Sequence, residues 1–341
     1  MNEVAAEASA ELAASTSEVR LRTRFRAGFV GFYRVLRANP LTFIGFILVV
    51  VITVTATLVA LVPFLTQLIL GHTVFFTPYD PNQLTTDYGL SPSWNHLLGT
   101  DHLGRDMFSR VLAALPLDLA IGFGITGFSL LLGGALGLVA GFWDKPRTVG
   151  GVVSTIILRV TDIFLAFPPL VLALAIAASL GRGTGPSVLA VLVTWWPYYV
   201  RLARGEVLAV KHQPYVMAAR AAGVSEPRIL FRHVLRNLVE PLVVYYTLDI
   251  GTVLVTFSTI SFVGIGVPLD VPEWGNMIEF YESKLLLLPW TVLSPGLAIF
   301  VTVLAFSLLG DGLRDVLDPR TRRALAQGAA TTASPAARSG G

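Results

Sequence analysis

Two histidines and two aspartates occur close together in the sequence, at His96, Asp101, His102 and Asp106. Imidazole nitrogens and carboxylate oxygens are both common zinc ligands, so this grouping admits a metal site. The same aspartates belong to the run GTDHLGRD, in which the glycines favour turns and Asp and Arg side chains can pair. We therefore expect Asp–Arg pairs that brace this segment, and no bound metal.

Glycine patterns form a second group with a possible chemical role. The GxGxxG pattern at 122–127 is typical of dinucleotide-binding turns, but those follow a strand and open a helix. Here the pattern lies inside a long apolar segment, which favours helix packing through small residues. Gly133, Gly137 and Gly141 recur at every fourth position and predict a close contact with another helix. The sequence contains no GxxxxGK[ST] phosphate loop, so any ATP that drives this protein must be hydrolysed on another chain.

Ionisable side chains inside apolar segments are a third group, because an unpaired charge in a membrane costs at least ~2.5–3.5 kcal/mol. Arg159 and Asp162 are close enough in sequence to pair on one face of a helix. Asp249 is flanked by tyrosines and by Thr252 but has no obvious ionic partner nearby. We expect Asp249 to face water, a solute or a cation on another subunit.

The amino-acid composition indicates whether these groups lie in a soluble protein or in a membrane protein. Of the 341 residues, 54% are hydrophobic and 14% are charged, whereas soluble proteins carry roughly a quarter charged residues. The mean hydropathy is +0.68. A net charge of +3 is too small to indicate nucleic-acid binding, and the absence of cysteine excludes disulfides and thiolate chemistry. These values indicate a protein that crosses a membrane several times.

Uncharged segments long enough to span a bilayer predict six transmembrane helices. They are 41–62, 119–143, 163–181, 183–200, 250–269 and 285–310, with the third starting near Val152 and the fifth near Leu238. Twenty-two helical residues cover ~33 Å, enough for a hydrocarbon core of ~30 Å. Pro168 and Pro169 are expected to kink the third span. The aromatic run at 195–199 is typical of a membrane interface.

Arginine and lysine predict the orientation, since cytoplasmic loops carry an excess of both. They are concentrated before the first span, after the second, between the fourth and fifth, and after the sixth. Both termini are therefore expected in the cytoplasm. Residues 1–40 form a polar N-terminal segment without a cleavable signal peptide, so the first span should remain as an anchor. The tail 319–341 is rich in small residues and is expected to be disordered.

The cytoplasmic segment between spans four and five reads HQPYVMAARAAGVSEPRILFRHVLRN. Tyr215–Ala222 favours a short helix, Gly223 can adopt the positive φ that ends it, and Ser225 can cap a second helix that begins at Glu226 and Pro227. The spacing alone leaves two interpretations open: a rigid knob on the cytoplasmic face, or an ordinary amphipathic loop at the lipid surface.

This segment resembles the "EAA" loop of binding-protein-dependent ABC importer permeases, whose pattern is Glu-Ala-Ala, three residues, Gly, nine residues, Ile, one residue, Leu-Pro. Ala218, Ala219, Gly223 and Leu235 agree with the pattern. Three positions depart from the pattern, where Met217 replaces Glu, His233 replaces Ile and Arg236 replaces Pro. Three further motifs resemble the C-type permease subunit of dipeptide and oligopeptide importers, at 98–110, 261–277 and 295–320. The resemblance covers about 36–320.

The resemblance implies an all-α membrane protein with six transmembrane helices of the ABC importer permease type. Its predicted parts are the N-terminal segment 1–40, a first helix with outer loop at 41–112, the permease domain 113–318 and the tail 319–341. A cytoplasmic coupling helix would contact the ATPase. The residues assigned to that contact are Tyr215, Met217, Ala218, Ala219, Gly223, Val224 and Ser225. Asp249, Thr252 and Thr256 are assigned to the translocation path.

The resemblance also implies partners and a location. We expect a second permease subunit, two cytoplasmic ATPases that hold ATP and Mg²⁺, and an extracytoplasmic solute-binding protein, in a prokaryotic plasma membrane. The chain itself is expected to have no catalytic residues, cofactor or metal. Peptides are the expected cargo, with oligosaccharides or nickel as alternatives. Two other functions are less consistent with the sequence. A passive channel would give the cytoplasmic knob no role. An intramembrane enzyme would require a nucleophile–base pair or metal ligands, which the predicted spans lack.

Overall fold

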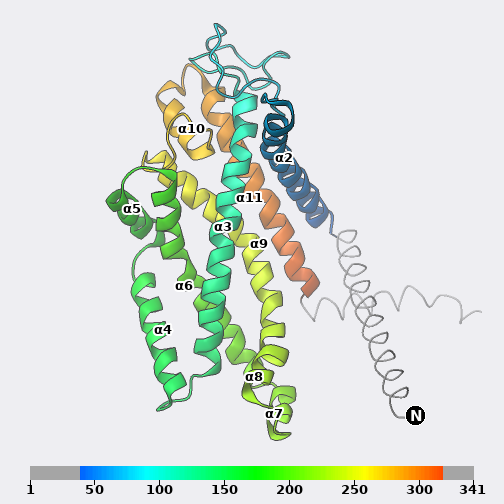
Figure 1. The fold of residues 1–341 in the computed structure, drawn as a ribbon, viewed down its shortest axis with the longest axis vertical. Coiled ribbons are helices and arrows are strands. Elements are labelled where there is room, and N and C mark those ends of the chain that lie inside the picture. The colour runs from blue at the N-terminus through cyan, green and yellow to red at the C-terminus, as the bar shows by residue number, and fades with distance from the viewer. Residues whose placement is uncertain (1–38, 318–341) are drawn as a thin grey trace, which may run out of the picture. The chain divides into compact units, whose positions relative to one another are not determined.

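The computed structural model describes residues 39–317, and every regular element in this range is a helix (Figure 1). The elements are α2 (Pro40–Leu70), α3 (Met107–Phe142), α4 (Val149–Leu165), α5 (Pro169–Leu180), α6 (Thr184–Lys211), α7 (Pro214–Ala221), α8 (Glu226–Ile229), η1 (Leu230–Val234), α9 (Leu235–Phe262), α10 (Trp274–Tyr281), η2 (Glu282–Lys284) and α11 (Pro289–Leu317). This confirms the all-α class. The predictions for the tail 319–341 and for nearly all of the N-terminal segment lie outside the described residues.

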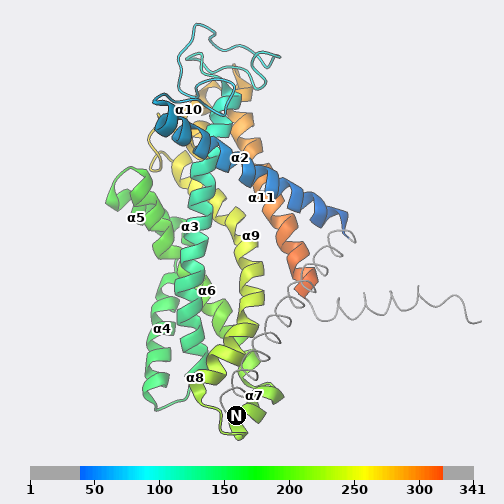
Figure 2. The ribbon, with the colours of Figure 1, turned by 45° about the vertical axis from the view of Figure 1, so that its right-hand side comes forward.

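The chain divides into two units, one made of residues 1–44 and 311–341 and the other of residues 45–310. The four-part division expected from the sequence stays a prediction. Within residues 45–310, the loop 71–106 and α10 lie at one end and α7 and α8 lie at the other (Figures 1 and 2).

Four helices in the described part of the chain are long and apolar enough to cross a membrane: α2, α3, the continuous helix 226–262 and α11. The pair α4 and α5 raises this number to five if it is one broken span. Helix α6 has 28 residues, but its Trp, Pro, Tyr and charged residues make it less apolar than the others. The six-span count stays a prediction.

The predicted kink at the proline pair is present as a sharp bend. Helix α4 ends at Leu165, α5 begins at Pro169, and the two helices make an angle of 85°. A proline disfavours helical backbone in the residue before it and cannot donate a hydrogen bond to the preceding turn. Two consecutive prolines therefore end α4, and Pro169 then occupies the first turn of α5, where it is tolerated.

The predicted close contact of the glycine stripe is confirmed between α3 and α6. A Cβ added to Gly133, Gly137 or Gly141 would lie 2.6, 2.7 or 2.8 Å from the Cβ of Tyr199, Ala203 or Val207 respectively. Only a hydrogen at each position allows the two backbones to approach so closely. In the GxGxxG pattern, Gly122 packs against α9, since a Cβ there would lie 3.3 Å from Ile250, whereas a Cβ on Gly124 would have nothing within 4 Å.

The loop 71–106 is braced as predicted. Arg105 Nε donates to Asp101 Oδ2 at 2.6 Å, and Tyr281 of α10 donates its hydroxyl to the same oxygen at 2.6 Å. His96 Nδ1 lies 2.9 Å from Asp106 Oδ1, and Asp106 caps α3 by accepting from Ser109 N at 2.8 Å. No group of three or more metal-binding side chains occurs among residues 39–317.

The electrostatics of Asp101 agree with this bracing. Burial alone would raise the pKa of Asp101, but the hydrogen bonds from Tyr281 and Arg105 outweigh burial and hold the pKa below its usual value. Burial raises the pKa of Tyr281 as well. The segment 264–284 contains α10, which Glu273 caps by accepting from Gly275 N and Asn276 N.

Candidate functional site

The first candidate site is the α7–α8 segment, residues 212–236, which contains the seven predicted coupling residues. Helix α7 ends in a Schellman motif: Val224 N donates to Ala219 O at 3.1 Å and Gly223 N donates to Arg220 O at 3.1 Å. Gly223 has φ +78°, a conformation that costs a residue with a Cβ ~1 kcal/mol or more. The positive φ predicted at Gly223 is confirmed.

A side-chain pair holds α7 and α8 together. Arg220 donates from Nε and Nη2 to the two carboxylate oxygens of Glu226, at 2.9 and 3.1 Å. Ser225 occupies the capping position of α8, but its side chain forms no capping hydrogen bond. The predicted cap by the Ser225 hydroxyl is therefore wrong, and Arg220 with Glu226 closes the turn instead. The π-helical turn η1 then joins α8 to α9 without a break.

Some side chains of the α7–α8 segment are buried and anchor it, and others are exposed to solvent. Val216, Ile229, Leu230 and Val234 are buried in the main apolar core. Tyr215, Met217, Ala218, Gly223 and Ser225 are exposed, while Ala219 and Val224 are half-buried. Five of the seven predicted coupling residues are thus exposed, while apolar side chains of the same segment anchor it in the core.

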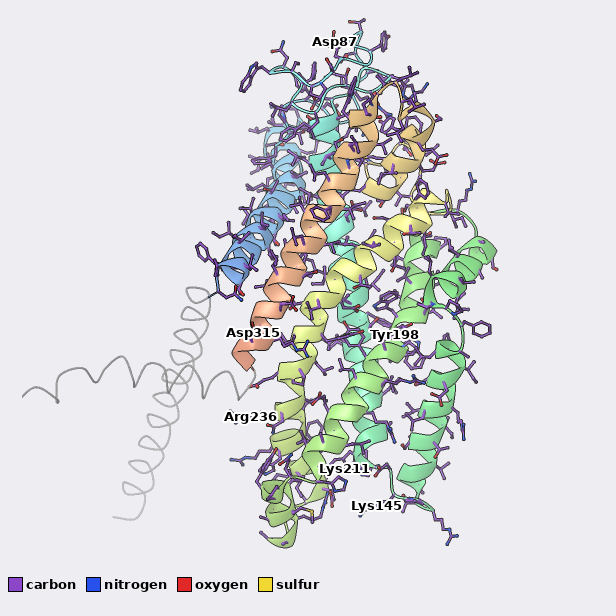
Figure 3. All side chains as sticks on the ribbon, turned by 180° about the vertical axis from the view of Figure 1, so that it is seen from behind. Asp87, Lys145, Tyr198, Lys211, Arg236 and Asp315 are labelled. Atoms are coloured by element: carbon purple, nitrogen blue, oxygen red, sulfur yellow. The ribbon has the colours of Figure 1, made fainter. Side chains whose placement is uncertain are left out.

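Lys211 fixes the end of α6 that precedes the α7–α8 segment. Its Nζ donates to Gly141 O at 3.0 Å and to Asp144 Oδ1 at 2.5 Å, so it ties the end of α6 to the end of α3. Lys145, Lys211 and Arg236 all lie at the α7–α8 end, opposite Asp87 of the loop 71–106 (Figure 3). The α7–α8 segment therefore projects from a fixed base.

The second candidate site surrounds Asp249 in the middle of α9. The hydrogen-bond partners of Asp249 come from α6: Oδ2 accepts one bond from Trp195 Nε1 at 2.7 Å and another from the Tyr199 hydroxyl at 3.0 Å. Trp195 and Tyr199 are one helical turn apart on α6, and they are 5% and 0% exposed. The interpretation of these two residues as an interfacial belt is therefore wrong, because both point into the protein.

A cavity of about 310 Å³ opens beside this carboxylate. Its lining residues are Pro169, Trp195, Tyr198, Tyr245, Leu248, Asp249 and Thr252. Tyr198 lies midway between the two ends of the described helices (Figure 3). The structure thus brings Asp249 and Thr252 to one cavity. Thr256 does not line it, and its hydroxyl donates to Thr252 O at 2.8 Å.

The other charge pair expected within a span is formed by different residues. Asp162 of α4 pairs with Arg201 of α6, with Arg201 Nη2 2.9 Å from Asp162 Oδ1. The predicted pairing of Asp162 with Arg159 on one helix face is wrong, because α6 presents a guanidinium to the same carboxylate.

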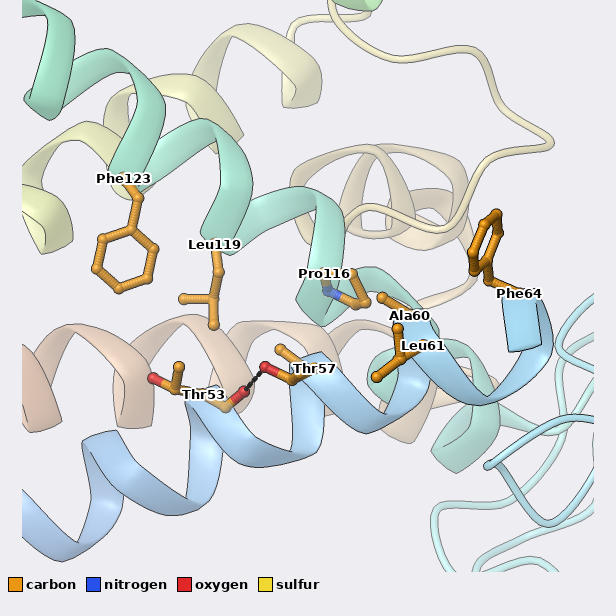
Figure 4. A pocket seen from close by; sticks show the side chains of 9 residues that line it. Thr53, Thr57, Ala60, Leu61, Phe64, Pro116, Leu119 and Phe123 are labelled. Atoms are coloured by element: carbon orange, nitrogen blue, oxygen red, sulfur yellow. Dashed lines mark hydrogen bonds between the residues drawn. The ribbon is translucent and has the colours of Figure 1, made fainter. Parts of the chain in front are cut away.

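A larger cavity of about 490 Å³ lies between α2 and α3 (Figure 4). It is lined by Thr53, Ala56, Thr57, Ala60, Leu61, Phe64, Pro116, Leu119 and Phe123. The Thr57 hydroxyl already donates to Thr53 O at 2.7 Å. With no acidic or basic side chain in its lining, this cavity offers apolar contact and little chemistry.

A solved structure shares the fold of this chain. A chain of the MetNI methionine ABC transporter, in an inward-facing conformation, superposes with a TM-score of 0.51 at 17% identity, covering 62% of this chain and 98% of that chain. At this identity the likeness shows the fold alone. The fold is that of an ABC transporter permease.

Sequence comparison gives the family. Residues 133–323 match the model of the binding-protein-dependent transport system inner membrane component, and the chain belongs to this family. The glutathione transport system permease protein GsiD of Pectobacterium atrosepticum is 40% identical over 251 residues, which are 73% of this chain and 81% of the relative. The dipeptide transport system permease protein DppC of Alkalihalophilus pseudofirmus is 38% identical over 68% of this chain and 74% of its own. The resemblance found in the motifs is confirmed.

Trp195 and Tyr199 were not predicted as hydrogen-bond partners of Asp249. A signal was available, because a tryptophan and a tyrosine four residues apart lie on one helix face and both carry a donor that needs a partner when buried. Asp249 is an acceptor in another apolar segment. The roles assigned to the coupling and path residues stay predictions.

Proposed function

We propose that this chain is the permease subunit of an ATP-driven importer and forms half of the translocation path for peptides or similar small solutes. Membership of the transport family carries the proposal, and the names of the glutathione and dipeptide transport relatives favour peptide cargo. Oligosaccharides or nickel are the alternative cargo. A second permease, two ATPases holding ATP and Mg²⁺, and an extracytoplasmic binding protein complete the transporter.

In this proposal the α7–α8 segment receives the motion of the ATPases. Its exposed face supplies the contact, and its buried anchors and the continuous helix 226–262 connect that face to Asp249. Nucleotide-driven closure of the ATPases would shift the segment, and α9 would move with it as a rigid body. The same motion would switch the path between inward-facing and outward-facing states, with the loaded binding protein biasing the other side.

Transport itself is the direct test. The complex, reconstituted in liposomes with its ATPases and binding protein, should accumulate radiolabelled glutathione or a dipeptide only when ATP is hydrolysed. Vanadate, which arrests ABC ATPases, is the matched control. Accumulation of nickel or a maltooligosaccharide in place of both peptides would favour the alternative cargo, and accumulation without ATP would contradict the importer.

The orientation can be tested because the chain has no cysteine. Ser91→Cys in the loop 71–106 and Ser225→Cys in the α7–α8 segment form a matched pair of exposed serines. An impermeant maleimide added to intact cells should label the first variant and not the second. Labelling of the Ser225→Cys variant from outside would reverse the proposed orientation and remove the ATPase contact from this segment.

A further inference from the structure

The cavity beside Asp249 has a lining unlike that of the larger cavity. Three aromatic side chains, Trp195, Tyr198 and Tyr245, share it with one acidic group, and Thr252 adds a hydroxyl. Among the described residues that line it, Asp249 is the one acidic or basic side chain. Aromatic faces and a carboxylate attract the same kind of ligand, a cation.

The carboxylate is positioned by one oxygen and offers the other. Trp195 Nε1 and the Tyr199 hydroxyl both donate to Oδ2, whereas Oδ1 receives none of the hydrogen bonds formed within residues 39–317, and Asp249 is one of the residues that line the cavity. Two bonds to a single oxygen fix the plane of the carboxylate. The free oxygen is therefore preorganised for a donor that comes from outside the fold.

The surrounding charges do not satisfy this carboxylate. Arg201 lies one turn beyond Tyr198 on α6, but it is paired with Asp162 at 2.9 Å. A charge in an apolar segment persists only when it is paired or wetted, and no salt bridge to Asp249 is formed within residues 39–317. A cavity of about 310 Å³ lies at the small end of the ~300–1,000 Å³ found for ligand sites.

We propose that this cavity, which we call the amine cage (Trp195, Tyr198, Tyr245, Asp249 and Thr252), binds the cationic amine of a small solute during its passage. A primary ammonium, such as the amino terminus of a peptide, places its N–H donors on Asp249 Oδ1 and its charge against the aromatic rings. A neutral solute of the same size gains neither contact. This inference rests on the proposed import function and names the cargo chemistry that this site selects.

Binding without transport tests the amine cage. The assembled permease–ATPase complex in nanodiscs, with binding protein and nucleotide omitted, is dialysed against radiolabelled alanyl-alaninamide, a cation, or against its N-acetyl derivative, which is neutral. The native complex should bind the cation and discriminate against the acetylated probe at least tenfold. Asp249→Asn, which keeps an acceptor for Trp195 and Tyr199, should weaken binding of the cation at least tenfold and remove the discrimination.

Two further variants test the cage walls and the specificity of the effect. Tyr198→Leu removes an aromatic face and should weaken binding of the cation about threefold to tenfold, whereas Tyr198→Phe should preserve it. Glu240→Gln removes an exposed acid from the same helix and should leave the dissociation constant unchanged. The Tyr198 variants decide the question if the Asn variant does not assemble.

Each outcome supports or overturns the inference. Equal affinity of the native and Asn complexes, or equal binding of both probes, overturns the amine cage. A lower melting temperature of the Asn complex with unchanged probe binding also overturns it, since Asp249 then pairs with the second permease. Probe binding in a complex that never imports a solute upholds the cage and contradicts the proposed function. Import of solutes with no selectivity for the amine supports the proposed function and overturns the amine cage.

Discussion

Asp101 and Arg220 each form an ion pair with a residue close in sequence, yet the two pairs hold their regions differently. The Asp101–Arg105 pair is buried, and Tyr281, far along the chain, joins it through bonds to both partners. The Arg220–Glu226 pair is 38% and 43% exposed, and it links only α7 with α8. The loop 71–106 is therefore fixed by contacts between distant parts of the chain.

The α7–α8 segment is instead built from local contacts. Its Schellman turn, its ion pair and its π-helical turn all join residues within a few positions, and only the apolar anchors connect it to the core. Such a unit keeps its own shape while it is displaced as a whole. The comparison indicates that the loop 71–106 is held by long-range contacts, whereas the α7–α8 segment can move as one unit.

The largest effect is expected from breaking the buried pair. Asp101→Ala leaves Arg105 charged, buried and without its carboxylate, which costs ~3–5 kcal/mol. We expect a large fall in the melting temperature of the complex and early proteolysis within residues 71–106. A melting curve that matches the native complex would show that the contacts around Asp101 do not fix this end.

Acid should loosen the same loop by a smaller amount, because a protonated Asp101 still accepts hydrogen bonds. Its pKa is held below the usual value by Tyr281 and Arg105, which outweigh burial. The stabilisation is therefore complete above the unfolded pKa of about 3.8 and is lost as the pH falls through the lower, folded value. Pepsin should cleave the loop 71–106 faster below about pH 4. In the Asp101→Asn variant, cleavage of this loop should not show that rise, because the variant has no carboxylate to protonate at this position.

The next effect concerns Gly223, whose backbone no other residue can adopt without strain. Gly223→Ala should cost the α7–α8 segment ~1 kcal/mol and lower the number of solute molecules imported per ATP; Gly223→Val should lower it further. Gly205→Ala is the matched control, because both glycines have open space around a new Cβ and Gly205 is helical with no positive φ. Native coupling in Gly223→Val would remove this segment from the coupling route.

The smallest effect is expected at the exposed pair. Arg220→Ala should change the free energy of unfolding by ~0–1 kcal/mol, since solvent screens exposed ion pairs. Melting of the complex in low and high salt measures this contribution. A loss as large as that of Asp101→Ala would abolish the contrast between the two ends.

Local rules explain what the sequence predicted well. The bend at Pro168 and Pro169 and the positive φ of Gly223 each depend on the chemistry of a few neighbouring positions. The Asp101–Arg105 pair also lies within one turn. For these features the sequence contains the whole physical cause.

Features that depend on how helices pack were missed. Asp162 pairs with Arg201 instead of Arg159, and Asp249 accepts hydrogen bonds from Trp195 and Tyr199. In both cases the partner lies on α6, at the same depth along the helix axes as the carboxylate. That depth follows from the contact of α6 with the glycine stripe, where the two backbones nearly touch. No spacing within α9 or α4 alone could reveal it.

The π-helical turn Leu230–Val234 has a consequence for the direction in which the exposed face points. A helix advances by about 100° per residue, and a π turn accommodates one residue more than an α turn in the same rise. Removing a single residue from 230–234 would convert it to α-helix and swing Tyr215 and Met217 by about 100° around the axis of α9. The number of residues in 230–234 thus sets the direction in which the exposed face of α7 points. A variant with every side chain of α7 intact could still turn that face away from its partner.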